Sequence, residues 1–377
     1  MHKAKVLVGS LCLMALSMSF TTQAKTFVYV SNSDSGKLSH YQLDERDGKL
    51  KFMDEIEAGA KVMPTSISPD KTYLYAATRK APFGLVSWKI DPKSGELTDK
   101  QVSPIDYSYA YIATDNDGKY LLGASYGQDV VVSYELKEGK LSEKPISVYK
   151  TGPHAHSVIV DKTNESVYVG NLGADKVLQL SLSPKGELAA IGDGGVDTVK
   201  GDGPRHSVIS PDNRFVYNIG EMGGVITQFE RDSKGALTKV SETPSAVADK
   251  YKLEHGKERP DGYSDPTPRI WSSDIKMTSN GKLIYVSERT SSTVAGYKVD
   301  KATGKLSLVG VWEVEKQPRG IAVTPNGKWL IVTGEKSNSV TTYKINNKTG
   351  VIIFAARAPA SNDKKPQDAN WISVVSF

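Results

Sequence analysis

The 377-residue sequence contains a single cysteine, Cys12, and it lies close to the N-terminus. The chain that follows it can form no disulfide and no thiolate metal site, so its stability must come from a hydrophobic core. The sequence also has only six histidines, and its 48 Lys and Arg residues are scattered among 43 Asp and Glu residues. No basic stripe interleaved with aromatic residues is present, which argues against nucleic acid as a partner.

The first 24 residues have the pattern of a secretory signal peptide. Lys3 and Lys5 precede an apolar run from Val6 to Phe20, and small residues lead up to Ala24. The run is about 15 residues long, shorter than the roughly 20 that a membrane-spanning helix needs. Leu11 is also too large to precede the cysteine of a lipoprotein cleavage site. We therefore expect cleavage after Ala24 and a periplasmic or secreted protein with no membrane contact.

A short β-branched and aromatic segment of strand length occurs seven times in the remaining chain. Many copies follow a turn signal such as Ser-Pro-Asp or Asn-Gly, as expected for strands. The seven copies occupy residues 27–30, 73–76, 120–123, 167–170, 215–218, 283–286 and 329–332.

A second alternating segment follows each copy, and a turn glycine follows that. These segments are centred on Tyr41, Trp88, Tyr134, Leu180, Phe229, Tyr297 and Tyr343. Most copies are about 44 to 49 residues apart, the length of one four-stranded propeller blade. The Gly-His and Trp-Asp pairs of WD repeats are missing, and the period of 2 excludes helical solenoids. We therefore predict an all-β fold, a seven-bladed β-propeller spanning residues 25–377 as one domain.

The two ends of the chain predict how the ring closes. The chain after Ala24 begins with a second-strand segment at Phe27, whereas Trp371 to Val375 resembles a first strand. The C-terminus should therefore supply the axial strand of the first blade, which removes exposed sheet edges. One interval is longer than the others, and residues 244–268 within it are too polar for a blade. We interpret them as an inserted loop, and long loops of this kind often bind ligands.

Polar side chains are predicted to gather on one face of the ring. Neighbouring strands are antiparallel, so the loop that enters a first strand and the loop that leaves a second strand lie at the same end. We call this end the polar face. Its predicted residues include His154, His156, Asn171, Arg205, His206, Glu221, Arg269, Trp271, Arg289 and Arg319. Arginines in such a ring suit an anionic or oxygen-rich ligand, because a guanidinium binds carboxylates and phosphates in a bidentate manner. Loops are polar on any propeller, so solvation alone is the alternative explanation.

His154 and His156 could share one face of a strand, as two metal ligands would. No third ligand is evident nearby, so we predict no metal site. No Gly-x-Ser-x-Gly motif and no cysteine nucleophile are available, so any hydrolysis would use an activated water. No nucleotide or haem motif is present either, and we expect no cofactor and a monomer.

Several of these motifs resemble those of the seven-bladed lactonase family, which includes propeller-type 6-phosphogluconolactonases and carboxy-cis,cis-muconate cyclase. They are Pro153-His154-Ala155-His156-Ser157, Gly203-Pro204-Arg205-His206, Glu221, Ser287-Glu288-Arg289-Thr290 and Gln317-Pro318-Arg319-Gly320. The resemblance covers nearly all of the chain from Lys25. It implies that His156, Arg205, Glu221 and Arg289 form the catalytic set.

By this resemblance we expect an exported lactonase that opens a sugar-acid lactone. His156 or Glu221 would be the general base for water, and Arg205 and Arg289 would bind the oxyanion. From their place on the polar face, and not from the resemblance, we expect contacts with the small-molecule substrate from His154, Asn171, His206, Arg269, Trp271 and Arg319. Phosphorylated sugars are scarce outside the cytoplasm, so an unphosphorylated aldonolactone such as gluconolactone is favoured. The alternatives are a propeller that binds a ligand without chemistry and a cycloisomerase that forms lactones.

Overall fold

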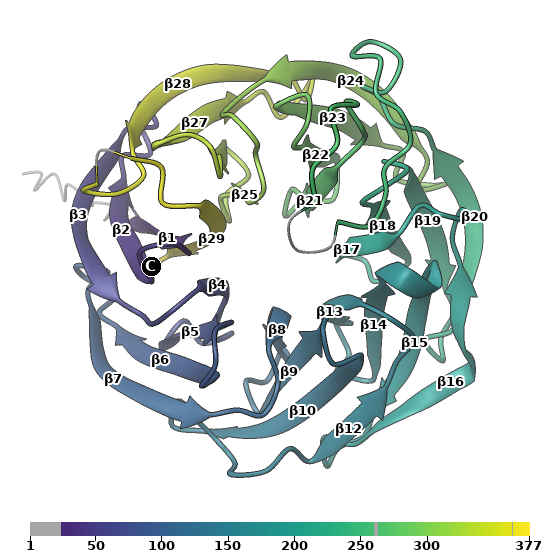
Figure 1. The fold of residues 1–377 in the computed structure, drawn as a ribbon, viewed down its shortest axis with the longest axis horizontal. Helices are drawn as coiled ribbons and strands as arrows, with labels where there is room; N and C mark the ends of the chain where they lie inside the picture. The colour runs from purple at the N-terminus through teal and green to yellow at the C-terminus, as the bar shows by residue number, and fades with distance from the viewer. Residues whose placement is uncertain (1–23, 260–262, 364) are drawn as a thin grey trace, which may run out of the picture.

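The computed structural model describes residues 24–259, 263–363 and 365–377, which form a ring of seven antiparallel sheets around a central axis (Figure 1). The predicted signal peptide, apart from Ala24, lies outside the described residues. In the part of the chain that is described, no helix is long and apolar enough to cross a membrane. The single 3-10 turn η1 (Leu172–Ala174) is the only helical element there.

Each sheet is one blade, and the prediction of a seven-bladed propeller is confirmed. From the axis outward, the first four blades are β29 (Ala369–Ser376), β1 (Thr26–Asn32), β2 (Lys37–Leu43) and β3 (Leu50–Glu57); β4 (Val62–Ile67), β5 (Tyr73–Thr78), β6 (Gly84–Ile90) and β7 (Leu97–Pro104); β8 (Tyr109–Thr114), β9 (Tyr120–Ser125) and β10 (Val130–Lys137), with β11 (Lys140–Leu141) and β12 (Ser147–Lys150) outermost; and β13 (Ala155–Val160), β14 (Ser166–Asn171), β15 (Lys176–Leu182) and β16 (Leu188–Asp197).

The last three blades follow the same order. They are β17 (Pro204–Ile209), β18 (Phe215–Gly220), β19 (Ile226–Arg231) and β20 (Leu237–Thr243); β21 (Ser272–Met277), β22 (Leu283–Glu288), β23 (Thr293–Val299) and β24 (Leu306–Glu313); and β25 (Ile321–Val323), β26 (Trp329–Thr333), β27 (Ser339–Ile345) and β28 (Ile352–Pro359). Every one of the seven recurring sequence segments forms the second strand of its blade.

The second strands are apolar on both faces because each blade packs between two others. All seven residues of β1 and all six of β14 are buried, whereas the outer strand β7 is mostly exposed. The hydrophobic clusters accordingly join neighbouring blades: one contains Phe27 and Tyr29 of the first blade together with Leu74 and Trp88 of the second. Burial between blades, and not within one sheet, therefore supplies the core.

The turn glycines link each blade to the one before it. Gly95 has a φ of 76° between β6 and β7, and a Cβ atom there would lie 2.4 Å from the ring of Phe27. The Tyr29 hydroxyl donates a 2.6 Å hydrogen bond to the Gly95 carbonyl. The carbonyls of all seven turn glycines accept such a bond from the preceding blade, and the donors are Thr342, Tyr29, Ser87, Ser133, Tyr168, Tyr217 and Tyr285.

The ring closes as predicted, because β29 pairs with β1 in an antiparallel manner. The C-terminal strand is therefore the axial strand of the blade that contains the start of the described chain (Figure 1).

The connection between β20 and β21 leaves the blade pattern. Within it the Glu254 amide donates to the carbonyl of Pro268, and the Ile270 amide donates to that of Glu254. The Gly256 amide reaches the carbonyl of Met222 over 2.8 Å. Through this bond, the described part of the predicted inserted loop contacts the turn that carries Glu221.

Candidate active site

The first strands of the blades are irregular where they begin on the polar face. In six of the seven blades the pairing between the first and second strand shifts register at this end. In β13 the shift leaves His156 without a partner residue, and in β17 it leaves Arg205 without one. A bulge of this kind redirects a side chain, and bulges are frequent beside active sites.

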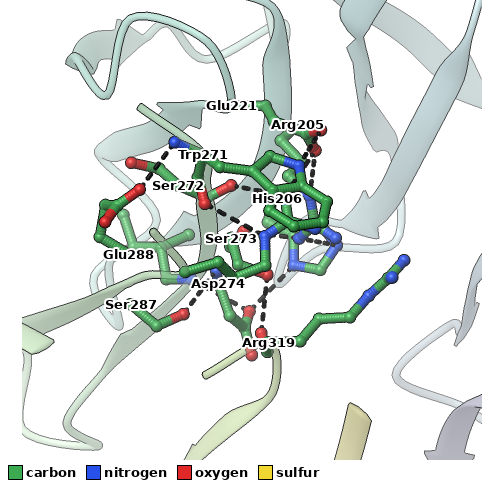
Figure 2. A network of polar contacts seen from close by, with 12 residues as sticks. Arg205, His206, Glu221, Trp271, Ser272, Ser273, Asp274, Ser287, Glu288 and Arg319 are labelled. Atoms are coloured by element: carbon green, nitrogen blue, oxygen red, sulfur yellow. Dashed lines mark hydrogen bonds and ion pairs between the residues drawn. The ribbon is translucent and has the colours of Figure 1, made fainter. Parts of the chain in front are cut away.

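Arg205, Glu221 and Arg289 meet in one largely buried group. We call this group, together with His206, Trp271 and Asp274, the axial cluster, and Figure 2 labels all of its members except Arg289. Pro204 pairs with Gly220, so the residues that follow each, Arg205 and Glu221, lie at the same end of the blade. Arg289 follows β22 in the next blade. The structure thus brings together three of the four residues of the predicted catalytic set, and the fourth, His156, lies beside them.

The Glu221 carboxylate is held by three donors. Its Oε2 atom lies 2.6 Å from Arg205 Nε and 3.1 Å from Arg289 Nη2, and its Oε1 atom accepts a 2.9 Å bond from Trp271 Nε1. Burial alone would raise the pKa of Glu221, but the guanidiniums of Arg289 and Arg205 overcome this effect and lower it to about 2. Glu221 is therefore an anion with little remaining capacity to accept a proton.

The two arginines are almost completely buried, and each retains one free terminal nitrogen. Arg205 is 1% exposed, and its Nη1 donates to the Ser273 carbonyl and to His206 Nε2. Arg289 donates from Nε to the Trp271 carbonyl and from Nη2 to the Ser272 carbonyl. Among the described residues, Arg205 Nη2 and Arg289 Nη1 have no hydrogen-bond partner. These two nitrogens can donate to an oxygen of a bound ligand.

Asp274 and His206 form a hydrogen-bonded chain that ends at Arg205. The Nδ1 atom of His206 lies 2.9 Å from Asp274 Oδ1, and Lys276 Nζ lies 2.8 Å from the same oxygen. Burial, followed by the charge of Arg205, lowers the pKa of His206 to about 3, so the ring is neutral. With Arg205 donating to Nε2, the single ring proton resides on Nδ1 and is donated to Asp274.

His156 is buried beside the cluster, and its hydrogen-bonding capacity is unused. Its ring centroid lies 5.2 Å from that of His206 and 5.7 Å from that of Tyr126, both in edge contacts. No described residue forms a hydrogen bond with either ring nitrogen, and Nδ1 is a buried atom. Burial and the nearby Arg205 guanidinium lower the pKa of His156 well below its usual value, so the ring is neutral.

His154 lies next to Tyr126 and precedes strand β13. It has a φ of 65°, and its ring stacks on that of Tyr126 with centroids 4.2 Å apart. The alternation of strand side chains, on which the interpretation of His154 and His156 as a same-face metal pair rested, therefore does not apply. Over residues 24–259, 263–363 and 365–377, no group of three or more His, Cys, Asp and Glu residues has an arrangement that could hold a metal ion.

Asn171 and Arg269, which we expected to contact substrate, are occupied within loops. Asn171 is fully buried, and its amide bonds to the backbone of Gly152 and Pro153. Arg269 pairs with Asp265 at 2.6 Å and with Glu254 at 3.0 Å in the connection between β20 and β21. Both side chains brace loops that surround the axial cluster, and their expected contact with substrate stays a prediction.

Trp271 and Arg319 do face the cluster. The guanidinium of Arg289 lies 3.8 Å from the centroid of the Trp271 ring, and that of Arg259 lies 3.9 Å from it. Arg319 pairs with Glu335 through Nη1 at 2.9 Å, while its Nε is buried without a partner.

Sequence reasoning missed Asp274 and Arg259. The available signal for Asp274 was a charged residue inside the strand segment Ser272–Met277. No sequence signal pointed to Arg259, because its loop has no counterpart in the other blades.

Comparison with known proteins agrees with this geometry. The family model described as "Lactonase, 7-bladed beta-propeller" matches residues 20–364. A 6-phosphogluconolactonase of Pectobacterium atrosepticum is 32% identical over 78% of this chain and 83% of its own. One from Yersinia enterocolitica is 30% identical over 78% of this chain and 84% of its own.

Among solved structures, a periplasmic gluconolactonase from Pseudomonas aeruginosa shares the fold, with a TM-score of 0.77 and 21% identity over 93% of this chain and 99% of that chain. The protein is therefore a member of the seven-bladed β-propeller lactonase family, a 6-phosphogluconolactonase-like carboxylic ester hydrolase.

Proposed function

We propose that this protein hydrolyses a sugar-acid lactone at the axial cluster. The observation that carries the proposal is the pair of buried guanidiniums, Arg205 and Arg289, that share Glu221, together with the neutral His156, which lies near Arg205 and has no hydrogen bond to any described residue. Ester hydrolysis by water needs donors for the developing oxyanion and an acceptor for the proton of water. The cluster supplies the donors and the adjacent His156 supplies the acceptor, in a largely buried environment where such donors are most effective.

In this mechanism His156 is the general base. Glu221 is the other candidate, but its carboxylate oxygens are already held by Arg205, Arg289 and Trp271. His156 is neutral and has no hydrogen bond to any described residue, so it is available to accept a proton from water. The water oxygen attacks the lactone carbonyl, and the carbonyl oxygen becomes an oxyanion bound by Arg205 and Arg289. The C–O bond of the ring then breaks, and the protonated His156 returns its proton to the alkoxide.

Glu221 and Asp274 position these groups. Glu221 fixes both arginines through one carboxylate, and Asp274 fixes Arg205 through His206. Preorganised donors of this kind need no reorientation when charge develops in the transition state.

The favoured substrate is an unphosphorylated aldonolactone such as gluconolactone, and the favoured location is the periplasm. Two observations support this choice: the signal-peptide pattern of residues 1–24 and the fold shared with a periplasmic gluconolactonase. Because relatives are named 6-phosphogluconolactonase, the phosphorylated lactone is the substrate with which the unphosphorylated lactones must be compared.

A pH-stat assay tests this proposal. Acid release would be followed with glucono-1,5-lactone, galactono-1,4-lactone and 6-phosphogluconolactone, each corrected for spontaneous hydrolysis. We expect acceleration of at least one unphosphorylated lactone. Hydrolysis of none of them above the spontaneous rate would refute the proposal, and binding without turnover would favour a ligand-binding propeller.

A further inference from the structure

Arg79 is a cation of the polar face that has no counterion. It follows β5 in the second blade, three blades away from Glu221 in the fifth, so it lies across the axis from Glu221. Its contacts are long and neutral: Nε lies 3.4 Å from Ser108 Oγ, and Nη1 lies 3.6 Å from Met63 Sδ. Among the residues that the structure describes, no carboxylate lies within ion-pair distance of Arg79.

Arg79 also belongs to a group of cations that outnumber their counterions. Arg79, Arg205, Arg289 and Arg319 come from four different blades, yet among the described residues only Glu221 and Glu335 form ion pairs with members of this group. Burial, followed by the charges of Arg319 and Arg205, lowers the pKa of Arg79 to about 10. The guanidiniums therefore repel one another, and an unpaired, half-buried cation of this kind costs stability unless a ligand supplies negative charge.

Arg319 lies between Arg289 and Arg79 in the order of the blades around the ring. It precedes β25 in the seventh blade, so only the first blade separates it from the blade of Arg79. Its Nη1 is engaged by Glu335, but its Nε is buried without a partner, as is Asn370 Oδ1 nearby in the first strand of the intervening blade. Figure 2 marks no hydrogen bond or ion pair between the Arg319 side chain and Glu221. Arg79 and Arg319 are thus not among the donors that the proposed hydrolysis uses.

We propose that Arg79 and Arg319 form a subsite for an anionic substituent of the lactone, so that the preferred substrate carries a charged oxygen group remote from its ring. A carboxylate and a phosphate both fit this chemistry, because a guanidinium binds either one through paired N–H donors. The inference rests on the proposed hydrolysis and refines its substrate: among unphosphorylated lactones, the preferred one carries a second carboxylate.

The test compares charged and neutral lactones that have the same ring size. Values of kcat/KM would be measured for glucaro-1,4-lactone against galactono-1,4-lactone and for 6-phosphogluconolactone against glucono-1,5-lactone. The wild-type protein should prefer the charged member of at least one pair. In Arg79→Gln the charged-to-neutral ratio should fall about tenfold to a hundredfold, the loss expected for one hydrogen bond to a charged group. A fall in the ratio for the first pair indicates a subsite for a carboxylate, and a fall for the second pair indicates a subsite for a phosphate.

Two further measurements separate this inference from the proposed function. Calorimetric titration of glucarate, 6-phosphogluconate and gluconate into wild-type and Arg79→Gln protein reports the subsite even if no lactone is hydrolysed. Arg214→Gln removes a surface arginine whose guanidinium, among the described residues, forms one ion pair, the 3.9 Å contact with Glu230, and it controls for the loss of one positive charge. An equal loss on charged and neutral lactones, or no change in either the ratio or the binding of the charged acids, would overturn the inference.

Discussion

The Nε atom of Arg205 lies 2.6 Å from Oε2 of Glu221, and this ion pair is shared with Arg289 in the interior of the polar face. Removal of the carboxylate would leave two buried guanidiniums side by side. We predict that Glu221→Gln lowers the free energy of unfolding by about 3–5 kcal/mol, as when one partner of a buried pair is removed. Urea unfolding measures the effect.

Glu230→Gln is the matched control for this substitution. The Glu230 side chain is 53% exposed, and its contact with Arg214 is 3.9 Å long. Its loss should change the free energy of unfolding by less than about 0.5 kcal/mol. Equal effects of the two substitutions would show that the Glu221 pair does not stabilise the fold.

A second prediction concerns the general base. His156→Ala should lower kcat by about 10²- to 10⁴-fold, the usual contribution of a positioned base, while the melting temperature stays close to that of the wild type. His154→Ala removes the neighbouring ring that stacks on Tyr126 and should have a much smaller effect on kcat. If the two variants lose activity equally, His156 is not the base.

The buried His206 predicts how stability depends on pH. The ring takes up a proton near pH 6.5 when it is unfolded but only near pH 3 when it is folded. Unfolding therefore takes up a proton between pH 3 and pH 6.5. The contribution of the neutral His206 ring to the free energy of unfolding is complete above pH 6.5 and decreases as the pH falls. Glu221, with a pKa of about 2, acts in the same direction below pH 4.5.

Melting temperatures measured from pH 8 to pH 3 would show this decrease. His206→Asn removes the titrating group, so its melting temperature should fall less steeply between pH 6.5 and pH 4 than that of the wild type. Parallel curves for the two proteins would show that the ring of His206 is not held neutral.

The turn glycines yield a prediction about the ring itself. Gly95→Ala would place a Cβ atom 2.4 Å from the Phe27 ring at a residue with a φ of 76°. We expect a loss of about 1–3 kcal/mol in unfolding free energy from overpacking and backbone strain. At Gly127 a Cβ atom would meet no other atom within 4 Å, so Gly127→Ala should be nearly neutral in the same measurement.

The blades could be predicted because the sequence signal for each one is local and repeated. The second strands are buried on both faces, which makes segments such as 27–30 and 167–170 apolar and easy to recognise. The resemblance of Trp371–Val375 to a first strand was enough to predict closure of the ring. The hydroxyl bonds to the turn glycines were not predicted, because they join blades whose residues lie far apart in the sequence.

The candidate site was predicted less completely. Antiparallel pairing alone placed Arg205, Glu221 and Arg289 on one face, but the bulges that leave His156 and Arg205 unpaired have no signal in one sequence. Asn171 has the right position on the polar face, yet its amide is occupied by the loop that it braces. Position on a face can be derived from topology, whereas the direction of a side chain depends on its packing.

The most direct test of catalysis at the axial cluster compares the wild-type protein with Arg289→Ala in the pH-stat on glucono-1,5-lactone. Arg289 supplies a free donor to the proposed oxyanion, and loss of one such donor typically lowers kcat by about 10²- to 10³-fold. We predict a wild-type rate well above spontaneous hydrolysis and a loss of that size in a variant with unchanged circular dichroism. Equal rates for the two proteins would contradict the assignment of the axial cluster as the active site.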